Sequence, residues 1–309
     1  MPPFSGHVEG SLVDFGMDTI SLAGPLQAKL DAIRNAGFSQ VMLLARDLGG
    51  HPEGWRAAVQ EVKDSGLRVT GFQVLRDFEG LSGHLHEYKI DIAKSMLEMC
   101  HALGCGVMLA CSSTSTHATG DTSASVKDLR KLAIPKDIKI AFEGLSWGRT
   151  INEFPQARDV VSQADMPNLG LGFDSFHMSA TKTPLDELEM VDPDKIFLVQ
   201  LADFMWTGIK TVEERISTAR AFRVLPGEGV HSEALAELTL KLHTMGYRGD
   251  YSFEVFNDDY QQMPLETVAQ RARRSALWVG GRRVAPLGAV AEPDAVAPLK
   301  TSVSAPCHE

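Results

Sequence analysis

Three features that define large classes of proteins are missing from this sequence. No apolar run approaches the roughly 20 residues that a membrane-spanning helix requires. Basic residues are outnumbered, with 30 Lys and Arg against 40 Asp and Glu and a formal net charge of −10, whereas nucleic-acid binding needs a basic face. The first residues lack the basic stretch and apolar core of an export signal. We therefore expect a cytoplasmic protein that binds neither nucleic acid nor membranes.

Cysteine is also scarce, with four in 309 residues. Cys100, Cys105, Cys111 and Cys307 show no zinc-finger spacing, so we expect buried, reduced thiols. The remaining composition, 44% hydrophobic and 23% charged, is ordinary for a globular chain, and this length suits one barrel-type domain.

What the sequence does contain is a repeated cadence of helix, glycine and short apolar strand, typical of βα units whose helices end at glycine. The cadence predicts helices over 26–36, 52–65, 84–103, 125–133 (short and partly irregular), 153–164, 185–190 (weak), 232–245 and 265–279. It predicts strands over 19–22, 40–44, 68–74, 107–111, 139–143, 169–174, 196–200 and 250–255. These eight units predict an α/β protein with one (β/α)8 TIM-barrel domain over residues 1–279.

Two segments depart from the cadence. Residues 204–229 form a long insertion after the seventh expected strand. Residues 280–309 are rich in Ala, Pro and Val without periodicity, which predicts a disordered C-terminal tail.

Four successive strands of the later half end in oxygen-bearing side chains: Glu143, Asp174, Gln200 and Glu254. The carboxyl ends of barrel strands open onto one face, and three buried carboxylates together need a cation to balance them. One such residue is typical of a polar rim, but four favour a metal site. An all-oxygen set suits a divalent ion such as Mg²⁺, Mn²⁺ or Co²⁺.

Other polar residues follow the same strand ends. His177 comes three residues after Asp174, on the loop we expect to leave that strand, where it could bind substrate or carry a proton; the alternative is an ordinary core histidine. Ser112 and Ser113 follow the fourth strand and could bond substrate hydroxyls or merely cap the loop.

Arginines gather at this face as well: Arg76, Arg149, Arg220 and Arg223 follow strands three, five and seven. Guanidinium groups bind carboxylate or phosphate in a bidentate manner, which implies a small anionic substrate. The alternative for any one of them is an ion pair with a neighbouring carboxylate such as Asp77.

At these residues the chain resembles the xylose-isomerase-like TIM-barrel superfamily of sugar-phosphate isomerases, epimerases and dehydratases, and within it the bacterial 3-dehydroshikimate dehydratases. The matching segments are TISLAG at 19–24, FQVLRDFEG at 72–80, CSS at 111–113, EGLSWGR at 143–149, DSFH at 174–177, VQLAD at 199–203, RAFRVLPG at 220–227 and FEVFND at 253–258.

The resemblance implies a metal-dependent carbon–oxygen lyase that dehydrates 3-dehydroshikimate, a cyclic hydroxyketone with a carboxylate, to protocatechuate. A metal-stabilised enolate would form and water would leave. The family's metal ligands fall on the four strand-end residues above. Its substrate contacts fall on Arg76, Ser112, His177, Arg220 and Arg223, and we add Ser113 as a substrate contact. The catalytic candidates are His177, Glu143 and Glu254, with the general base left open among His177, a carboxylate and a water.

Two positions depart from the family pattern. Arg46 stands where those dehydratases carry an acidic stretch, and Ala221 stands where a histidine is expected. The alternatives are therefore an isomerase, an epimerase or an inosose-type dehydratase acting on another keto-sugar or cyclic hydroxyketone. From a different class comes a non-catalytic barrel subunit. Assembly into a homo-oligomer is possible in each case.

Overall fold

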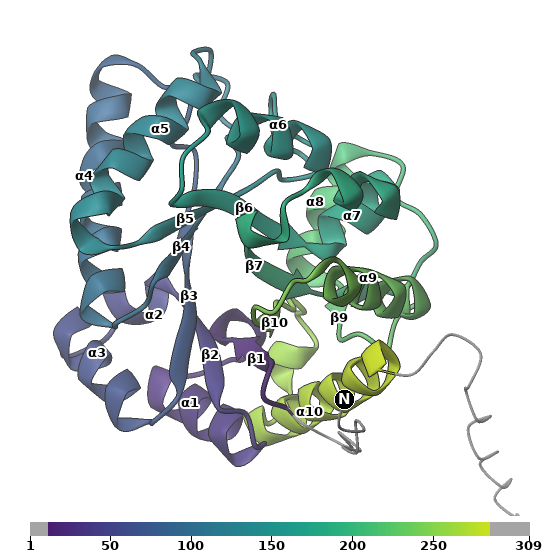
Figure 1. The fold of residues 1–309 in the computed structure, drawn as a ribbon. Helices are drawn as coiled ribbons and strands as arrows, with labels where there is room; N and C mark the ends of the chain where they lie inside the picture. The colour runs from purple at the N-terminus through teal and green to yellow at the C-terminus, as the bar shows by residue number, and fades with distance from the viewer. Residues whose placement is uncertain (1–11, 285–309) are drawn as a thin grey trace, which may run out of the picture.

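Eight parallel strands close into a barrel in the computed structural model, which describes residues 12–284 (Figure 1). Around the barrel the strands follow the order β1-β10-β7-β6-β5-β4-β3-β2. The prediction of a single (β/α)8 TIM barrel is therefore confirmed. The strands are β1 (Phe15–Asp18), β2 (Gln40–Leu44), β3 (Arg68–Leu75), β4 (Val107–Cys111), β5 (Lys139–Glu143), β6 (Leu169–Asp174), β7 (Ile196–Leu201) and β10 (Tyr251–Phe253).

Helices surround the barrel (Figure 1). Gly66 and Gly104 follow two of them with φ of 73° and 70°, a left-handed conformation that glycine adopts without a Cβ clash. The helices are α1 (Leu26–Asn35), α2 (Ala45–Gly49), α3 (Trp55–Asp64), α4 (Gly83–Ala102), α5 (Thr122–Ala133), α6 (Phe154–Ala164), α7 (Ser175–Thr181), α8 (Val212–Ala221), α9 (Ser232–Met245) and α10 (Leu265–Val284).

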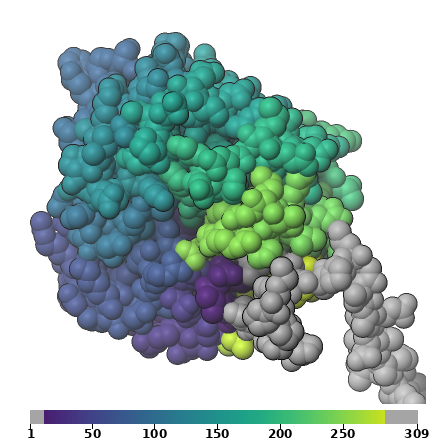
Figure 2. All heavy atoms as spheres, in the orientation of Figure 1, coloured from purple at the N-terminus to yellow at the C-terminus, as the bar shows by residue number. Residues whose placement is uncertain are grey.

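The two ends of the described chain meet to close the structure. β1 pairs with β10, with Phe15 opposite Tyr251, and the space-filling view shows purple N-terminal residues against the last segments (Figure 2). Side chains alternate along each strand, so every second one packs outward against the helices. A smaller buried cluster including Met42, Leu109 and Leu198 faces the barrel interior. This apolar plug forms the floor beneath the polar strand ends.

Three predicted elements are corrected. The first strand is Phe15–Asp18, and residues 19–21 form the 3-10 turn η1 (Thr19–Ser21), because the Asp18 carboxylate accepts the Ile20 N–H at 3.0 Å. Helix α5 is regular rather than irregular, since Asp121 caps it by accepting the Ala124 N–H. The weak helix over 185–190 is the 3-10 segment η3 (Leu185–Met190), and α7 precedes it.

The insertion after β7 has a defined structure. It contains α8, whose N-terminus is closed by a reciprocal capping box between Thr211 and Glu214. It also contains a two-stranded antiparallel sheet of β8 (Asp203–Phe204) and β9 (Arg223–Val224). The insertion thereby brings Arg220 and Arg223 to the cavity described below.

The last helix continues five residues past its predicted end, through Val284, so the first part of the predicted tail is helical. The remainder of that tail and Cys307 lie outside the described residues. The other three cysteines are buried free thiols. Among residues 12–284, no helix is both long and apolar enough to cross a membrane.

Candidate active site

The four predicted strand-end donors come from strands that are neighbours in the barrel. Glu143 and Asp174 are the last residues of β5 and β6, Gln200 lies one residue before the end of β7, and Glu254 directly follows β10. Asp174 and Gln200 are partners in register. All four side chains are buried.

Arg223 ties two of these side chains together. Its Nη1 donates to Asp174 Oδ2 at 2.7 Å and to Glu254 Oε2 at 2.9 Å, and the residue is only 2% exposed. Glu143, Asp174 and His177 each offer one potential ligand atom within 4.8 Å of the others. Two carboxylates, Glu143 and Asp174, therefore share one small buried volume with His177, and Glu254 is joined to Asp174 through Arg223.

The charges in this volume do not balance. Burial, followed by the charges of Asp174 and Glu254, raises the pKa of Glu143 to about 8. Burial also raises the pKa of Glu254, although Arg223 opposes this. Among the described residues, Glu143 Oε1 and Gln200 Oε1 are buried without a hydrogen-bond partner. Unpartnered oxygens beside excess negative charge fit a divalent cation, so the donor set present suits such an ion.

His177 lies in α7 rather than on the predicted loop, because the Asp174 carboxylate accepts the Phe176 N–H at 2.8 Å and starts a helix there. The Ser146 N–H donates to His177 Nδ1 at 3.1 Å. Burial lowers the pKa of His177 to about 4, so the ring is neutral at pH 7. A neutral ring whose Nδ1 accepts a hydrogen bond carries its proton on Nε2.

That tautomer separates His177 from the carboxylate ligands. Its Nε2 lies 3.6 Å from Asp174 Oδ2, and a protonated nitrogen donates a hydrogen bond but cannot coordinate a metal. The geometry therefore gives His177 the properties of a donor, and leaves the oxygen atoms of the strand-end residues as the candidate cation ligands.

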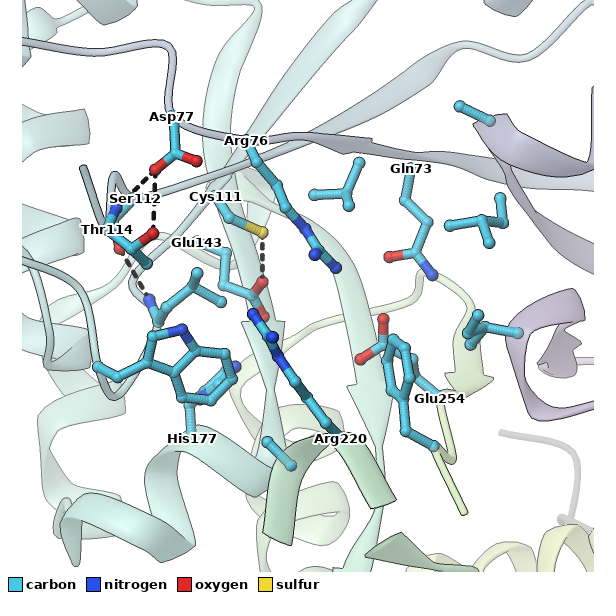
Figure 3. A pocket seen from close by; sticks show the side chains of 18 of the residues that line it. Gln73, Arg76, Asp77, Cys111, Ser112, Thr114, Glu143, His177, Arg220 and Glu254 are labelled. Atoms are coloured by element: carbon cyan, nitrogen blue, oxygen red, sulfur yellow. Dashed lines mark hydrogen bonds between the residues drawn. The ribbon is translucent and has the colours of Figure 1, made fainter. Parts of the chain in front are cut away.

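A cavity of about 650 Å³ opens above the carboxylates. Glu143, His177 and Glu254 line it, and so do Arg46, Arg76, Arg220 and Arg223. Figure 3 shows the guanidinium groups of Arg76 and Arg220 pointing into this pocket. Within the described chain, no ion pair involves the side chains of Arg46, Arg76 or Arg220. These three cations are therefore available to an anionic ligand.

The carboxylate beside Arg76 is engaged elsewhere. Asp77 accepts the Thr114 N–H at 2.7 Å (Figure 3) and also the Ser113 hydroxyl at 3.2 Å, and these bonds hold two loops together. Ser113 is not among the residues that line the cavity. Ser112 does line it; its Oγ accepts the Leu145 N–H at 2.9 Å, which leaves its own proton free to donate.

Two residues that the sequence analysis did not select belong to this site. Asp18 and Gln73 are buried, and Gln73 Nε2 donates to Asp18 Oδ2. Gln200 Nε2 lies 3.4 Å from Gln73 Oε1. Burial and then the charge of Glu254 raise the pKa of Asp18. The signal was present, because the apolar run Phe15–Asp18 ends in a carboxylate as the later strands do.

The xylose isomerase-like TIM barrel model matches residues 30–279. A 3-dehydroshikimate dehydratase of Pseudomonas putida is 35% identical over 84% of this chain, which spans 41% of that protein. An inosose isomerase of Bacillus licheniformis is 30% identical over 71% of this chain and 76% of the relative. This chain therefore spans less than half of the dehydratase relative it matches.

Solved structures agree in fold. A xylose isomerase-like TIM barrel/4-hydroxyphenylpyruvate dioxygenase fusion protein superposes with a TM-score of 0.81 at 32% identity, over 88% of this chain and 43% of that one. The IOLI protein with a binding zinc atom gives 0.74 at 22% identity, over 86% and 98%. The chain belongs to the xylose isomerase-like TIM barrel family.

Proposed function

We propose that this protein is a divalent-metal-dependent lyase that dehydrates 3-dehydroshikimate to protocatechuate. One observation carries the proposal: a carboxylate oxygen of Glu143 and the amide oxygen of Gln200 are buried without partners at the base of a cavity whose arginines include three without ion pairs among the described residues. The names of the curated dehydratase relatives support the choice of substrate. Its ring carboxylate suits the arginines, and its ketone suits the cation.

The cation would be Mg²⁺, Mn²⁺ or Co²⁺, held by Glu143, Asp174, Gln200 and Glu254. When bound, such an ion stabilises the negative charge that develops on a ketone oxygen. The unpartnered Oε1 atoms of Glu143 and Gln200 support this ligand set. The proton on His177 Nε2 supports leaving the histidine outside it.

The substrate would be oriented by the cavity wall. Arg76 and Arg220 point into the pocket and would hold the carboxylate, since charge-assisted guanidinium–carboxylate bonds are strong and directional. Arg46 adds a third cation on the same wall. Ser112 keeps its hydroxyl proton free for a substrate oxygen.

The reaction removes a proton from the carbon beside the ketone and then releases the β-hydroxyl as water, after which the ring becomes aromatic. The carboxylate of Glu143 or Glu254, both of which line the cavity, would accept the proton and return it to the departing hydroxyl. His177 would donate its Nε2–H to a developing oxygen charge as a neutral imidazole. Transfer of a proton by His177 during the reaction, as the sequence analysis predicted, remains a prediction.

The test is direct. Metal-free protein and protein loaded with Mn²⁺ or Mg²⁺ are each incubated with 3-dehydroshikimate, and protocatechuate is followed by its ultraviolet absorbance. The proposal expects an aromatic product only in the loaded sample. Loaded protein that yields no product contradicts the substrate assignment.

The inosose isomerase relatives favour a second candidate, an isomerase of an uncharged cyclic hydroxyketone. This activity would exchange the hydrogen beside the ketone for solvent deuterium without loss of water. NMR of an inosose incubated with loaded protein in D2O separates the two. An uncharged ring would leave the arginines of the wall without a counter-charge, so the anionic substrate remains our first choice.

A further inference from the structure

Gln200 presents a problem of orientation that the carboxylates do not share. Either oxygen of a carboxylate can bind a cation, whereas an amide has one oxygen that can and one NH2 group that cannot. The two ends of the amide have nearly the same shape, so packing alone does not distinguish them. A hydrogen-bond partner has to select which end faces the cation.

The selection begins at Asp18, at the end of β1. Its Oδ1 accepts the Ile20 N–H at 3.0 Å, and its Oδ2 accepts from Gln73 Nε2. Gln73 also hydrogen-bonds Glu254, and this bond opposes the rise in the pKa of that carboxyl, as a donated N–H does. Both bonds turn the NH2 group of Gln73 toward the carboxylates.

Gln73 passes this polarity on to Gln200. With its NH2 group committed, Gln73 has only Oε1 to offer, and Gln200 Nε2 lies 3.4 Å from it. The sulfur of Met42, a weak acceptor, lies 3.8 Å from the same nitrogen. Gln200 Oε1 is the end left without a partner among the described residues. Asp18, Gln73 and Gln200 are 0–1% exposed, so these bonds are buried.

We propose that Asp18 and Gln73 are positioning residues that orient the Gln200 amide with its oxygen toward the cation. This inference rests on the proposed metal site. It assigns a role to β1 and β3, which supply none of the four proposed ligands. Partners of this kind around metal ligands typically change metal affinity by about 10- to 100-fold.

The test is a double-mutant cycle read by Mn²⁺ affinity. Asp18→Asn places an NH2 group beside Gln73. Gln73 would then turn its oxygen toward residue 18 and its NH2 group toward Gln200, and Gln200 would turn its oxygen away from the cation. Affinity should fall at least about tenfold. Gln200→Glu removes the need for selection, because both ends of a carboxylate are oxygen. In that background Asp18→Asn should change affinity by less than about threefold.

A second pair of variants and a control test the same inference at other residues. Gln73→Met keeps the bulk but removes the relay, and should repeat the loss and its suppression by Gln200→Glu. The control is Asp47→Asn. Asp47 is a second carboxylate whose charge acts on Asp18, but it bonds Lys29 and not Gln73. Its substitution should leave Mn²⁺ affinity within about threefold. Calorimetry gives the affinity, and the visible spectrum of bound Co²⁺ reports a changed ligand atom.

The outcomes separate the two proposals. Equal Mn²⁺ affinity of Asp18→Asn and the unaltered protein overturns the positioning role. A loss that is the same in both Gln200 backgrounds also overturns it, since a general structural or charge effect does not depend on the ligand at residue 200. An unaltered protein that binds no Mn²⁺ overturns the proposed metal site and this inference with it.

Discussion

The backbone N–H of Ser146 donates to Nδ1 of His177 at 3.1 Å, and this bond fixes what the other ring nitrogen can do. With Nδ1 as the acceptor, the neutral ring carries its proton on Nε2. The histidine beside Asp174 is thereby a hydrogen-bond donor, although its distance alone would also suit a metal ligand.

His177→Phe should therefore separate catalysis from metal binding. We expect kcat to fall by about 100-fold, because a donor to developing charge is lost. Mn²⁺ affinity measured by calorimetry should stay within about threefold. Glu143→Gln is the matched comparison and should weaken Mn²⁺ binding strongly. If His177→Phe weakens it as much, the histidine is a ligand and the tautomer argument is wrong.

Arg223→Met should destabilise the metal-free protein. The substitution leaves Asp174 and Glu254 buried without their shared cation, which costs about 3–5 kcal/mol in the free energy of unfolding. Saturating Mn²⁺ should return part of that loss. Urea unfolding with EDTA or Mn²⁺ measures both terms. Arg282→Met, at an exposed pair with Glu233, is the control and should cost no more than about 1 kcal/mol.

Glu143 predicts a pH dependence of the metal-free protein. Its pKa rises from an ordinary 4.5 to about 8 on folding, so the folded state holds a proton that the unfolded state has released. The free energy of unfolding is therefore highest below pH 4.5, and between pH 4.5 and pH 8 it falls by about 1.4 kcal/mol per pH unit. Glu143→Gln should be less sensitive over this range. Urea unfolding in EDTA at pH 5 and pH 8 measures the loss of stability in each protein. An equal loss in the unaltered protein and in Glu143→Gln would contradict this prediction.

Arg76→Ala and Arg220→Ala should each raise KM for 3-dehydroshikimate. Loss of one charged hydrogen bond, about 1.5–3 kcal/mol, corresponds to about a 10- to 100-fold change. Steady-state kinetics measures the effect, and unfolding curves should be unchanged because neither side chain makes an ion pair among the described residues. Arg149→Ala is the control, since Arg149 is not among the residues that line the cavity. A similar KM increase for all three would point to general electrostatics rather than contact.

Arg46 lines the cavity and should discriminate substrates by charge. Arg46→Ala should lower kcat/KM for 3-dehydroshikimate by about tenfold, the loss of one charged contact, and leave an uncharged inosose within about threefold. Kinetics with both compounds tests this. Equal effects on the two would show that Arg46 shapes the pocket without reading charge.

The sequence by itself determined the barrel and the positions of its polar strand ends. Helix-ending glycines and apolar runs are local signals, and Glu143 and Asp174 lie at strand ends because those runs stop there. The first strand was misplaced because residues 19–22 read as apolar, while the Asp18 cap that turns them into η1 is a side-chain bond.

Tertiary structure alone decided what each polar group can do. The resemblance offered Arg223 as a substrate contact, and it does line the cavity, but only the folded barrel pairs it with Asp174 and Glu254. Ser146 sets the tautomer of His177 from 31 residues away, and Gln73 meets Gln200 across 127 residues. Hydrogen-bond polarity and buried charge depend on distances between strands, and no local sequence pattern encodes those distances.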